Sequence, residues 1–170
     1  MTMSWVIRQT VAVLILPVTV VVVAPVWIAR AVDLEINLSM SSLEWVTAFL
    51  GLGALVAGSA LFLACVMRCG VEGKGTLAPW DPPGHLVASG PYAYVRNPMI
   101  SGVILVLLAE GLLLRSVPHV QWAGIFFLIN ATYIPLVEEP LLKAKFGQEY
   151  GEYRESVPRL IPRLRPWRGT

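Results

Sequence analysis

Long apolar stretches with almost no charge constrain this chain more than any other feature of its sequence. Residues 11–29 contain no Asp, Glu, Lys or Arg, and residues 43–67, 98–114 and 120–137 are nearly as apolar. A helix needs about 20 mainly apolar residues to cross a bilayer, because its backbone groups must be hydrogen-bonded within the segment. The four stretches therefore predict an all-α membrane protein with four transmembrane helices, forming a single membrane domain over residues 1–170.

The charge content of the chain excludes two other classes of protein. Only 14% of the residues are charged, whereas soluble domains average about 25%, so a soluble globular enzyme is excluded. The net charge is +2 and the 13 Lys and Arg residues form no basic face, which argues against nucleic-acid binding. Two cysteines and two distant histidines predict neither a disulfide framework nor a metal site.

The distribution of basic residues predicts the orientation of the spans. Four spans place both termini on the same side of the membrane. Of the 13 Lys and Arg residues, only Arg30 and Arg115 fall on the opposite side. Because short cytoplasmic segments are enriched in Lys and Arg, we expect cytoplasmic termini, a cytoplasmic loop over residues 68–97 and a cytoplasmic C-terminal segment over residues 139–170.

Prolines and small residues distinguish the first two predicted spans. Pro17 and Pro25 are expected to kink residues 11–29, which we interpret as a retained span and not a cleaved signal peptide. Small side chains in residues 43–67 should let a neighbouring helix approach closely. These small residues are Gly51, Gly53, Ala54, Ala57, Gly58 and Ala60.

The predicted loop is rich in Gly and Pro, which excludes a continuous helix, yet it also carries Trp80, Tyr92 and Tyr94. The aromatic residues favour a structured, functional loop over a flexible connector. At the end of the loop, Asn97 followed by Pro98 predicts a helix start with Asn97 as the N-cap. The free amides at this helix start, with Arg96 beside them, can receive a carboxylate. The alternative is a capped helix with an interfacial aromatic belt.

The short connection over residues 115–119 predicts a tight turn between the third and fourth spans. With the turn centred there, residues whose numbers sum to about 235 lie at equal depth on the two antiparallel helices. Glu138 then lies level with Asn97, and Glu138 and Glu139 both arrive near Arg96.

Two carboxylates, a guanidinium, helix amides and tyrosines at one rim predict a site for a zwitterionic ligand. In the alternative interpretation, the two acids only solvate a helix end and pair with Lys143.

The residues after Pro140 alternate apolar and charged side chains at helical spacing. This pattern predicts an amphipathic helix that lies on the membrane surface or folds over the site. Gly147 and Gly151 weaken this helix and allow a break in it. The prolines of residues 157–163 predict an extended tail.

Three motifs in the second half of the chain occur in a known order and spacing. They are GPYAYVRNP at residues 90–98, EEPLL at residues 138–142 and FGQEYGEYRESVPRLIP at residues 146–162. Together they make the chain similar to the isoprenylcysteine carboxyl methyltransferase and phospholipid methyltransferase family of integral-membrane enzymes. The first two spans match that family only in character.

The resemblance implies S-adenosylmethionine as methyl donor, bound at the cytoplasmic ends of the last two spans. It also implies an apolar or amphiphilic acceptor in the membrane, such as a prenylcysteine-like carboxylate or a lipid amine. Carried over by position, the cofactor-binding residues are Gly90, Pro91, Tyr92, Tyr94, Val95, Arg96, Asn97, Pro98, Glu138 and Glu139, with Tyr150, Tyr153 and Arg159 closing the pocket.

The chain departs from the family pattern at two positions. Many members have His at the position of Asn97 and Tyr at the position of Ile100. Asn cannot act as a base at neutral pH, so a general base at residue 97 is not expected here. The Arg-x-Pro signature is also similar to that of membrane sterol reductases, which use NADPH, and a non-enzymatic membrane subunit is a third possibility.

Four further residues are candidates for substrate binding: His85, Trp80, Asn130 and Glu110. His85 can take a proton from an acceptor or simply face solvent. Asn130 can instead hydrogen-bond to another helix. Glu110 is an acid inside the third span, where Arg115 is close enough to pair with it.

Overall fold

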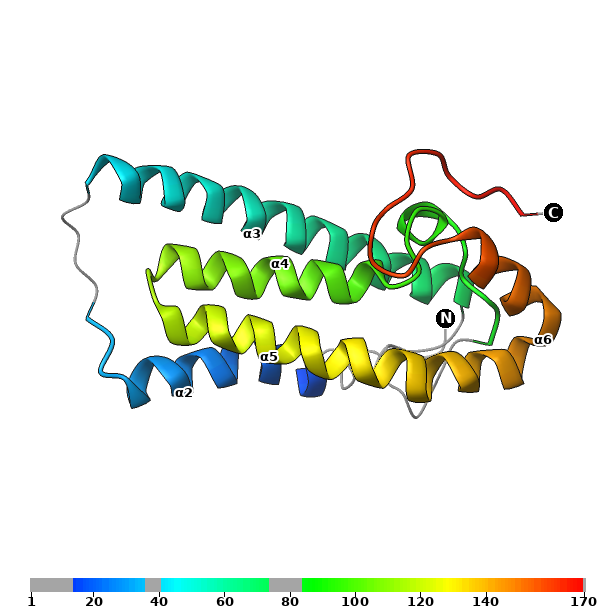
Figure 1. Ribbon diagram of the computed structural model, residues 1–170, viewed down its shortest axis with the longest axis horizontal. Helices are drawn as coiled ribbons and strands as arrows, with labels where there is room; N and C mark the ends of the chain where they lie inside the picture. The colour runs from blue at the N-terminus through cyan, green and yellow to red at the C-terminus, as the bar shows by residue number, and fades with distance from the viewer. Residues whose placement is uncertain (1–13, 36–40, 74–83, 170) are drawn as a thin grey trace.

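The computed structural model describes residues 14–35, 41–73 and 84–169, and every regular element in these segments is helical (Figure 1). The elements are η1 (Leu14–Val23, a π-helix), α2 (Ala24–Ala31), α3 (Ser42–Arg68), η2 (Cys69–Gly73, a π-helical turn), η3 (Gly90–Ala93, a 3-10 turn), α4 (Pro98–Leu113), α5 (Val117–Tyr133), η4 (Ile134–Glu138, a π-helical turn) and α6 (Glu139–Ser156). α4 packs between α3 and α5, and α2 contacts α5. The all-α prediction is confirmed for these segments.

Two helical stretches are long and apolar enough to cross a membrane: Ser42–Gly73, with 32 residues, and Val117–Ser156, with 40 residues. Pro17–Ala31 and Pro98–Leu113 are shorter apolar helices. Large apolar side chains point outward from the two long stretches; Phe49 is 68% exposed and Leu128 is 63% exposed. An apolar surface of this kind is suited to lipid and not to water.

The last long helix does not end at residue 137, where the fourth span was predicted to end. It continues from α5 through η4 into α6 without interruption. Its residues 117–146, which precede a bend at Gly147, cover about 45 Å at 1.5 Å per residue, or about one and a half times the thickness of a hydrocarbon core. A bilayer crossed by the first half therefore leaves much of α6 outside the hydrocarbon layer.

α6 bends sharply at Gly147, and we call this bend the elbow of α6 (Figure 1). Gly147 has φ 56° and ψ −125°, whereas Gly151 remains helical. The break that the two glycines allowed is therefore confirmed at Gly147 only. The first arm of α6 precedes the elbow, and the second arm turns back over the loop before α4.

Gly147→Ala is expected to destabilise the protein by about 1–3 kcal/mol, because side chains with a Cβ rarely adopt this backbone conformation. Steric contact adds nothing to this loss of stability, since no described atom lies within 4 Å of a Cβ built on Gly147. Gly151→Ala is the matched control; it should be neutral or slightly stabilising, because Ala favours a helix more than Gly. Thermal unfolding in detergent tests the pair, and equal effects of the two substitutions would contradict this interpretation of the elbow.

Glycines let α3 and α4 touch backbone to backbone. A Cβ built on Gly58 would lie 2.7 Å from the Gly102 carbonyl oxygen, and one built on Gly102 would lie 2.9 Å from the Gly58 oxygen. A Cβ on Gly51 would lie 3.0 Å from Leu113, whereas Gly53 is exposed and faces no described atom within 4 Å. The predicted close approach is confirmed at Gly51 and Gly58 and wrong at Gly53, because Gly53 lies on the outer face of α3.

Side chains of α5 hold the irregular first helix. Trp122 Nε1 donates to the Val20 carbonyl at 3.1 Å, and His119 Nε2 lies 3.1 Å from the Pro25 carbonyl oxygen. Pro25 has no amide hydrogen, so the Val20 carbonyl, five residues earlier, lacks its π-helical donor. Trp122 replaces that donor. The irregularity predicted from the prolines as a kink is therefore a π-helix held by side chains of α5.

Candidate functional site

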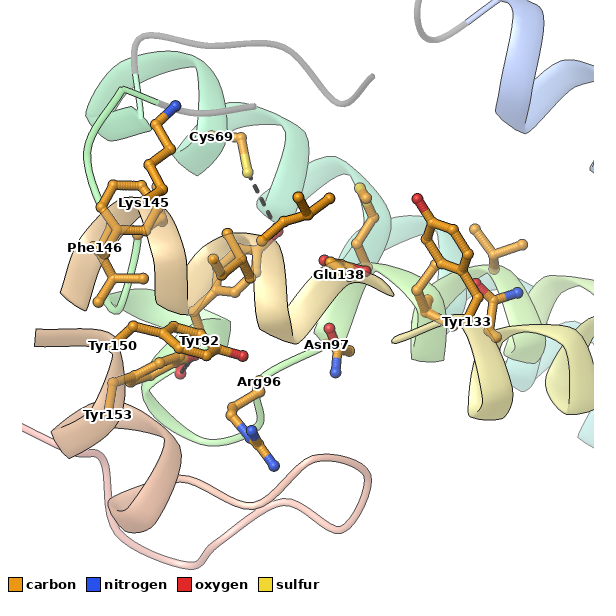
Figure 2. A pocket seen from close by; sticks show the side chains of 18 of the residues that line it. Cys69, Tyr92, Arg96, Asn97, Tyr133, Glu138, Lys145, Phe146, Tyr150 and Tyr153 are labelled. Carbon is orange, nitrogen blue, oxygen red and sulfur yellow. Dashed lines mark hydrogen bonds between the residues drawn. The ribbon is translucent and has the colours of Figure 1, made fainter. Parts of the chain in front are cut away.

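A cavity of about 400 Å³ lies between the helices and the loop before α4 (Figure 2). This volume is within the range of small-molecule sites, about 300–1,000 Å³. The lining residues are Pro17, Val20, Phe62, Cys69, His85, Leu86, Val87, Tyr92, Arg96, Asn97, Met99, Ile100, Val103, Phe126, Asn130, Tyr133, Glu138, Leu141, Leu142, Lys145, Phe146, Tyr150 and Tyr153.

The cavity has an apolar part and a polar part. Phe62 of α3, Val103 of α4 and Phe126 of α5 line the apolar part, from within the apolar helices. Glu138 and Asn97 belong to the polar part, at the end of the bundle where α4 begins (Figure 2). The cavity therefore suits a polar group at its rim and an apolar group inside the bundle.

The segment after α6 holds the loop that forms one wall of the cavity (Figure 1). Backbone hydrogen bonds tie the two segments together at three points. The amide of Arg96 in the loop donates to the Pro158 carbonyl in the tail at 2.9 Å. In the other direction, the tail amide of Arg163 donates to the Tyr94 carbonyl at 3.0 Å, and that of Trp167 donates to the Ala93 carbonyl at 2.9 Å. The tail is thus a strap across the loop, and the packing of Trp167 on Tyr153, with ring centroids 5.4 Å apart, extends it to α6.

Glu139 is buried beneath this strap and contacts three arginines. Its Oε1 lies 3.1 Å from Arg96 Nη1 and 2.8 Å from Arg159 Nε. Its Oε2 lies 3.2 Å from Arg154 Nε. We call these four residues the Glu139 cluster. It joins the loop, α6 and the tail, and it takes the place of the pairing with Lys143 that the alternative interpretation expected.

Glu138 lines the cavity, although the adjacent Glu139 does not. Consecutive helical residues point about 100° apart, and the π-helical turn η4 widens the helix immediately before Glu139. Figure 2 shows Glu138 on the same side of the cavity as Asn97. The predicted register is confirmed, because Asn97 and Glu138 share one cavity and Arg96 contacts Glu139.

Asn97 is the N-cap residue of α4 and Pro98 begins the helix, as predicted. The Asn97 side chain, however, forms no capping hydrogen bond within the described chain, and it lines the cavity instead. Met99 and Ile100 follow at the cavity wall, and the first amides of a helix have no partner within the helix. These amides can therefore bind an anionic group.

Tyr92 and Cys69 meet at the cavity wall, with 3.3 Å between the hydroxyl oxygen and the sulfur (Figure 2). Burial raises the pKa of Tyr92 well above its usual range. The phenol therefore stays protonated at neutral pH and offers the cavity a neutral hydrogen-bonding group.

The structure divides the residues that the sequence singled out. Those that line the cavity are Tyr92, Arg96, Asn97, Glu138, Tyr150, Tyr153, His85 and Asn130. Those outside the lining are Gly90, Pro91, Tyr94, Val95, Pro98, Glu139, Arg159 and Glu110. Trp80 lies outside the described residues. His85 is exposed and also lines the rim, so its exposure to solvent is confirmed, whereas its role as a proton acceptor stays a prediction.

Several lining residues were not predicted from the sequence, among them Phe62, Cys69, Tyr133, Lys145 and Phe146. For Lys145 and Phe146 a usable signal existed. They follow Glu138 by seven and eight residues, on the helical face that Leu141 and Leu142 share. For Phe62 no signal existed, because residues all around that helix are apolar.

Two expected contacts inside the bundle are wrong. Asn130 Nδ2 donates to the Phe126 carbonyl of its own helix at 2.8 Å, because a short amide side chain reaches back one turn more easily than across to a neighbour. Arg115 was expected to pair with Glu110, but its Nη1 instead lies 2.6 Å from Glu44 Oε1. Glu110 Oε2, in contrast, is buried without a hydrogen-bond partner among the described residues.

Comparison with known proteins adds an independent observation. No match was found among curated proteins. The sequence model of the phospholipid methyltransferase family matches residues 46–149, more than half of the chain. The matched region includes most of α3, the loop, α4, α5 and the first arm of α6, which supply most of the cavity wall. The chain therefore belongs to the phospholipid methyltransferase family of membrane methyltransferases.

Proposed function

We propose that this protein transfers a methyl group from S-adenosylmethionine to a membrane-embedded lipid or other amphiphilic acceptor at the cytoplasmic face. The observation that carries the proposal is one cavity that joins a polar rim to an apolar interior. A polar donor can enter such a cavity from water and an apolar acceptor can enter it from lipid, so the two can meet there. Family membership supports methyl transfer over the NADPH-dependent reductase and the non-enzymatic subunit.

The polar part of the cavity fits the chemistry of S-adenosylmethionine. Glu138 can accept hydrogen bonds from its ammonium group or ribose hydroxyls, and the amides of Met99 and Ile100 can receive its carboxylate. Phe146 and Tyr150 offer aromatic faces to an adenine or a sulfonium. When bound, this donor supplies an electrophilic methyl group on a good leaving group.

The chain contributes alignment and exclusion of water. The strap and the Glu139 cluster hold the loop, while the apolar walls keep water from the interior of the cavity. For methyl transfer from a sulfonium, positioning and a dry site supply much of the acceleration. Asn97 can hydrogen-bond to an acceptor but cannot take its proton at neutral pH.

The proposed membrane arrangement has four spans in a single membrane domain, with both termini, the loop and the tail in the cytoplasm. The two long apolar helices and the two shorter ones support this arrangement. The excess of basic residues at the cavity end supports the orientation. The cavity rim then faces cytoplasmic S-adenosylmethionine.

Glu138→Gln is expected to weaken donor binding about 10- to 100-fold, because a charge-assisted hydrogen bond contributes about 1.5–3 kcal/mol. Isothermal titration of S-adenosylmethionine into detergent-solubilised protein measures the affinity. Glu149→Gln, at an exposed position on the same helix, is the matched control. If Glu138→Gln binds S-adenosylmethionine with unchanged affinity, the donor does not bind in this part of the cavity.

Two further measurements separate the possible functions. Thermal stabilisation by S-adenosylmethionine and not by NADPH is the expected result, whereas the reverse would favour the reductase. Incubation with methyl-labelled donor and a lipid extract, followed by identification of the labelled product, would identify the acceptor class.

A further inference from the structure

A second, smaller pocket lies inside the elbow of α6 and is lined by Arg96, Lys143, Gly151, Arg154 and Glu155. Its volume is about 250 Å³. Lys143 comes from the first arm of α6, while the other α6 residues come from the second arm. Arg96 borders both this elbow pocket and the main cavity. The two spaces therefore meet at one buried guanidinium.

The elbow pocket has an excess of positive charge. Three of its lining side chains are cationic, and Glu155, which is exposed, is the one acid among them. The nearby carboxylate of Glu139 is already shared by Arg96, Arg154 and Arg159. One buried carboxylate cannot neutralise three guanidinium groups, so an added anion would be attracted to this pocket.

Arg96 also has buried nitrogen atoms that lack hydrogen-bond partners. Only 10% of its side chain is exposed, yet its Nε and Nη1 have no hydrogen-bond partner among the residues that the structure describes. The contact of Nη1 with Glu139 is an ion pair at 3.1 Å without hydrogen-bond geometry. Buried donors of this kind are costly unless a partner satisfies them. In Figure 2 the guanidinium points away from Glu138.

We propose that the elbow pocket binds a phosphate group. Guanidinium groups match the oxygens of phosphate with two parallel hydrogen bonds, and an ammonium group adds a point charge. A phosphate held by Lys143 and Arg154 would connect the two arms of α6, and contact with Arg96 would connect both arms to the loop. The proposal does not depend on the ligand of the main cavity. The phosphate can come from a lipid headgroup or from solution, and the experiment separates these sources.

The test uses the full-length protein in a maltoside detergent, which carries no phosphate. In one arm inorganic phosphate is titrated against sodium chloride of equal ionic strength. In the other arm a phosphatidylglycerol is compared with a diacylglycerol that has the same acyl chains and no phosphate. Thermal unfolding is followed by tryptophan fluorescence. Saturable stabilisation by the phosphate-bearing compound in at least one arm is expected, and the responding arm identifies the source.

Lys143→Gln should weaken the apparent affinity for the responding compound about tenfold, and Lys143→Arg should retain it. Lys143 is exposed, so its replacement should not prevent folding. Lys145→Gln is the matched control, because Lys145 is two residues away and lines the main cavity instead. No stabilisation in either arm, or equal weakening by Lys143→Gln and Lys145→Gln, would overturn the proposal.

Discussion

Glu139→Ala is expected to destabilise the protein by about 3 kcal/mol and to loosen the strap from the loop. The substitution leaves Arg96 buried without a counter-charge, and breaking a buried ion pair from one side costs about 3–5 kcal/mol. The lower end of this range applies, because Arg154 and Arg159 are partly exposed and solvent compensates them. Thermal unfolding in detergent measures the loss of stability.

Hydrogen exchange identifies where the structure opens in Glu139→Ala. Faster exchange is expected at the amides of Arg96, Arg163 and Trp167, which bond the loop to the tail. Glu149→Ala, at an exposed position on α6, should change neither stability nor exchange by much. A Glu139→Ala protein as stable as the Glu149→Ala protein would show that the cluster does not hold the strap.

Gly58→Leu is expected to destabilise the protein by about 3 kcal/mol or to force α3 and α4 apart. Even a Cβ at this position would lie 2.7 Å from the backbone oxygen of Gly102, which cannot rotate away as a side chain can. Overpacking of a tight contact typically costs about 1–3 kcal/mol, and a rigid backbone partner places this case at the upper end. Thermal unfolding in detergent measures the change.

Gly53→Leu provides the control for Gly58→Leu. Gly53 lies on the same helix, is exposed and has no described atom within 4 Å of its Cβ position. A leucine there would face lipid and should change the free energy of unfolding by less than about 0.5 kcal/mol. Comparable losses in the two variants would mean that helix composition, and not the contact with Gly102, determines the cost.

The different environments of Glu138 and Glu139 predict different effects of substitution at these two positions. Glu138 faces the cavity, whereas Glu139 is committed to three arginines. We therefore expect Glu138→Gln to reduce donor affinity with little loss of stability, and Glu139→Ala to reduce stability first. The sequence alone does not distinguish the roles of these two acids.

Much of the architecture could be predicted because it depends on local or periodic features. Apolar stretches located the helices, since a segment in lipid must satisfy its own backbone hydrogen bonds. Asn97 before Pro98 located the start of α4, and the short turn set the register that brings Arg96 to Glu139. Each of these inferences uses only residue spacing and the fixed rise of a helix.

Other features depend on contacts that residue spacing does not specify. The side chain of Asn97 faces the cavity and not its own helix start. Only the tertiary structure shows that Trp122 supplies a donor to Val20, or that Arg115 pairs with Glu44. These pairings join segments distant in sequence, and many alternative partners of similar chemistry exist for each.

The sequence by itself therefore determined that this chain is helical, apolar and polar at one rim, because helix periodicity and the cost of unsatisfied groups in lipid act locally. The tertiary structure decided which rim residues line the cavity and which form the ion pairs beneath the strap. A π-helical turn that ends at Glu138 places this residue in the cavity lining, and the elbow at Gly147 brings Arg154 to Glu139 together with Arg96 and Arg159. Such directions follow from how the segments pack, and packing is a property of the whole fold.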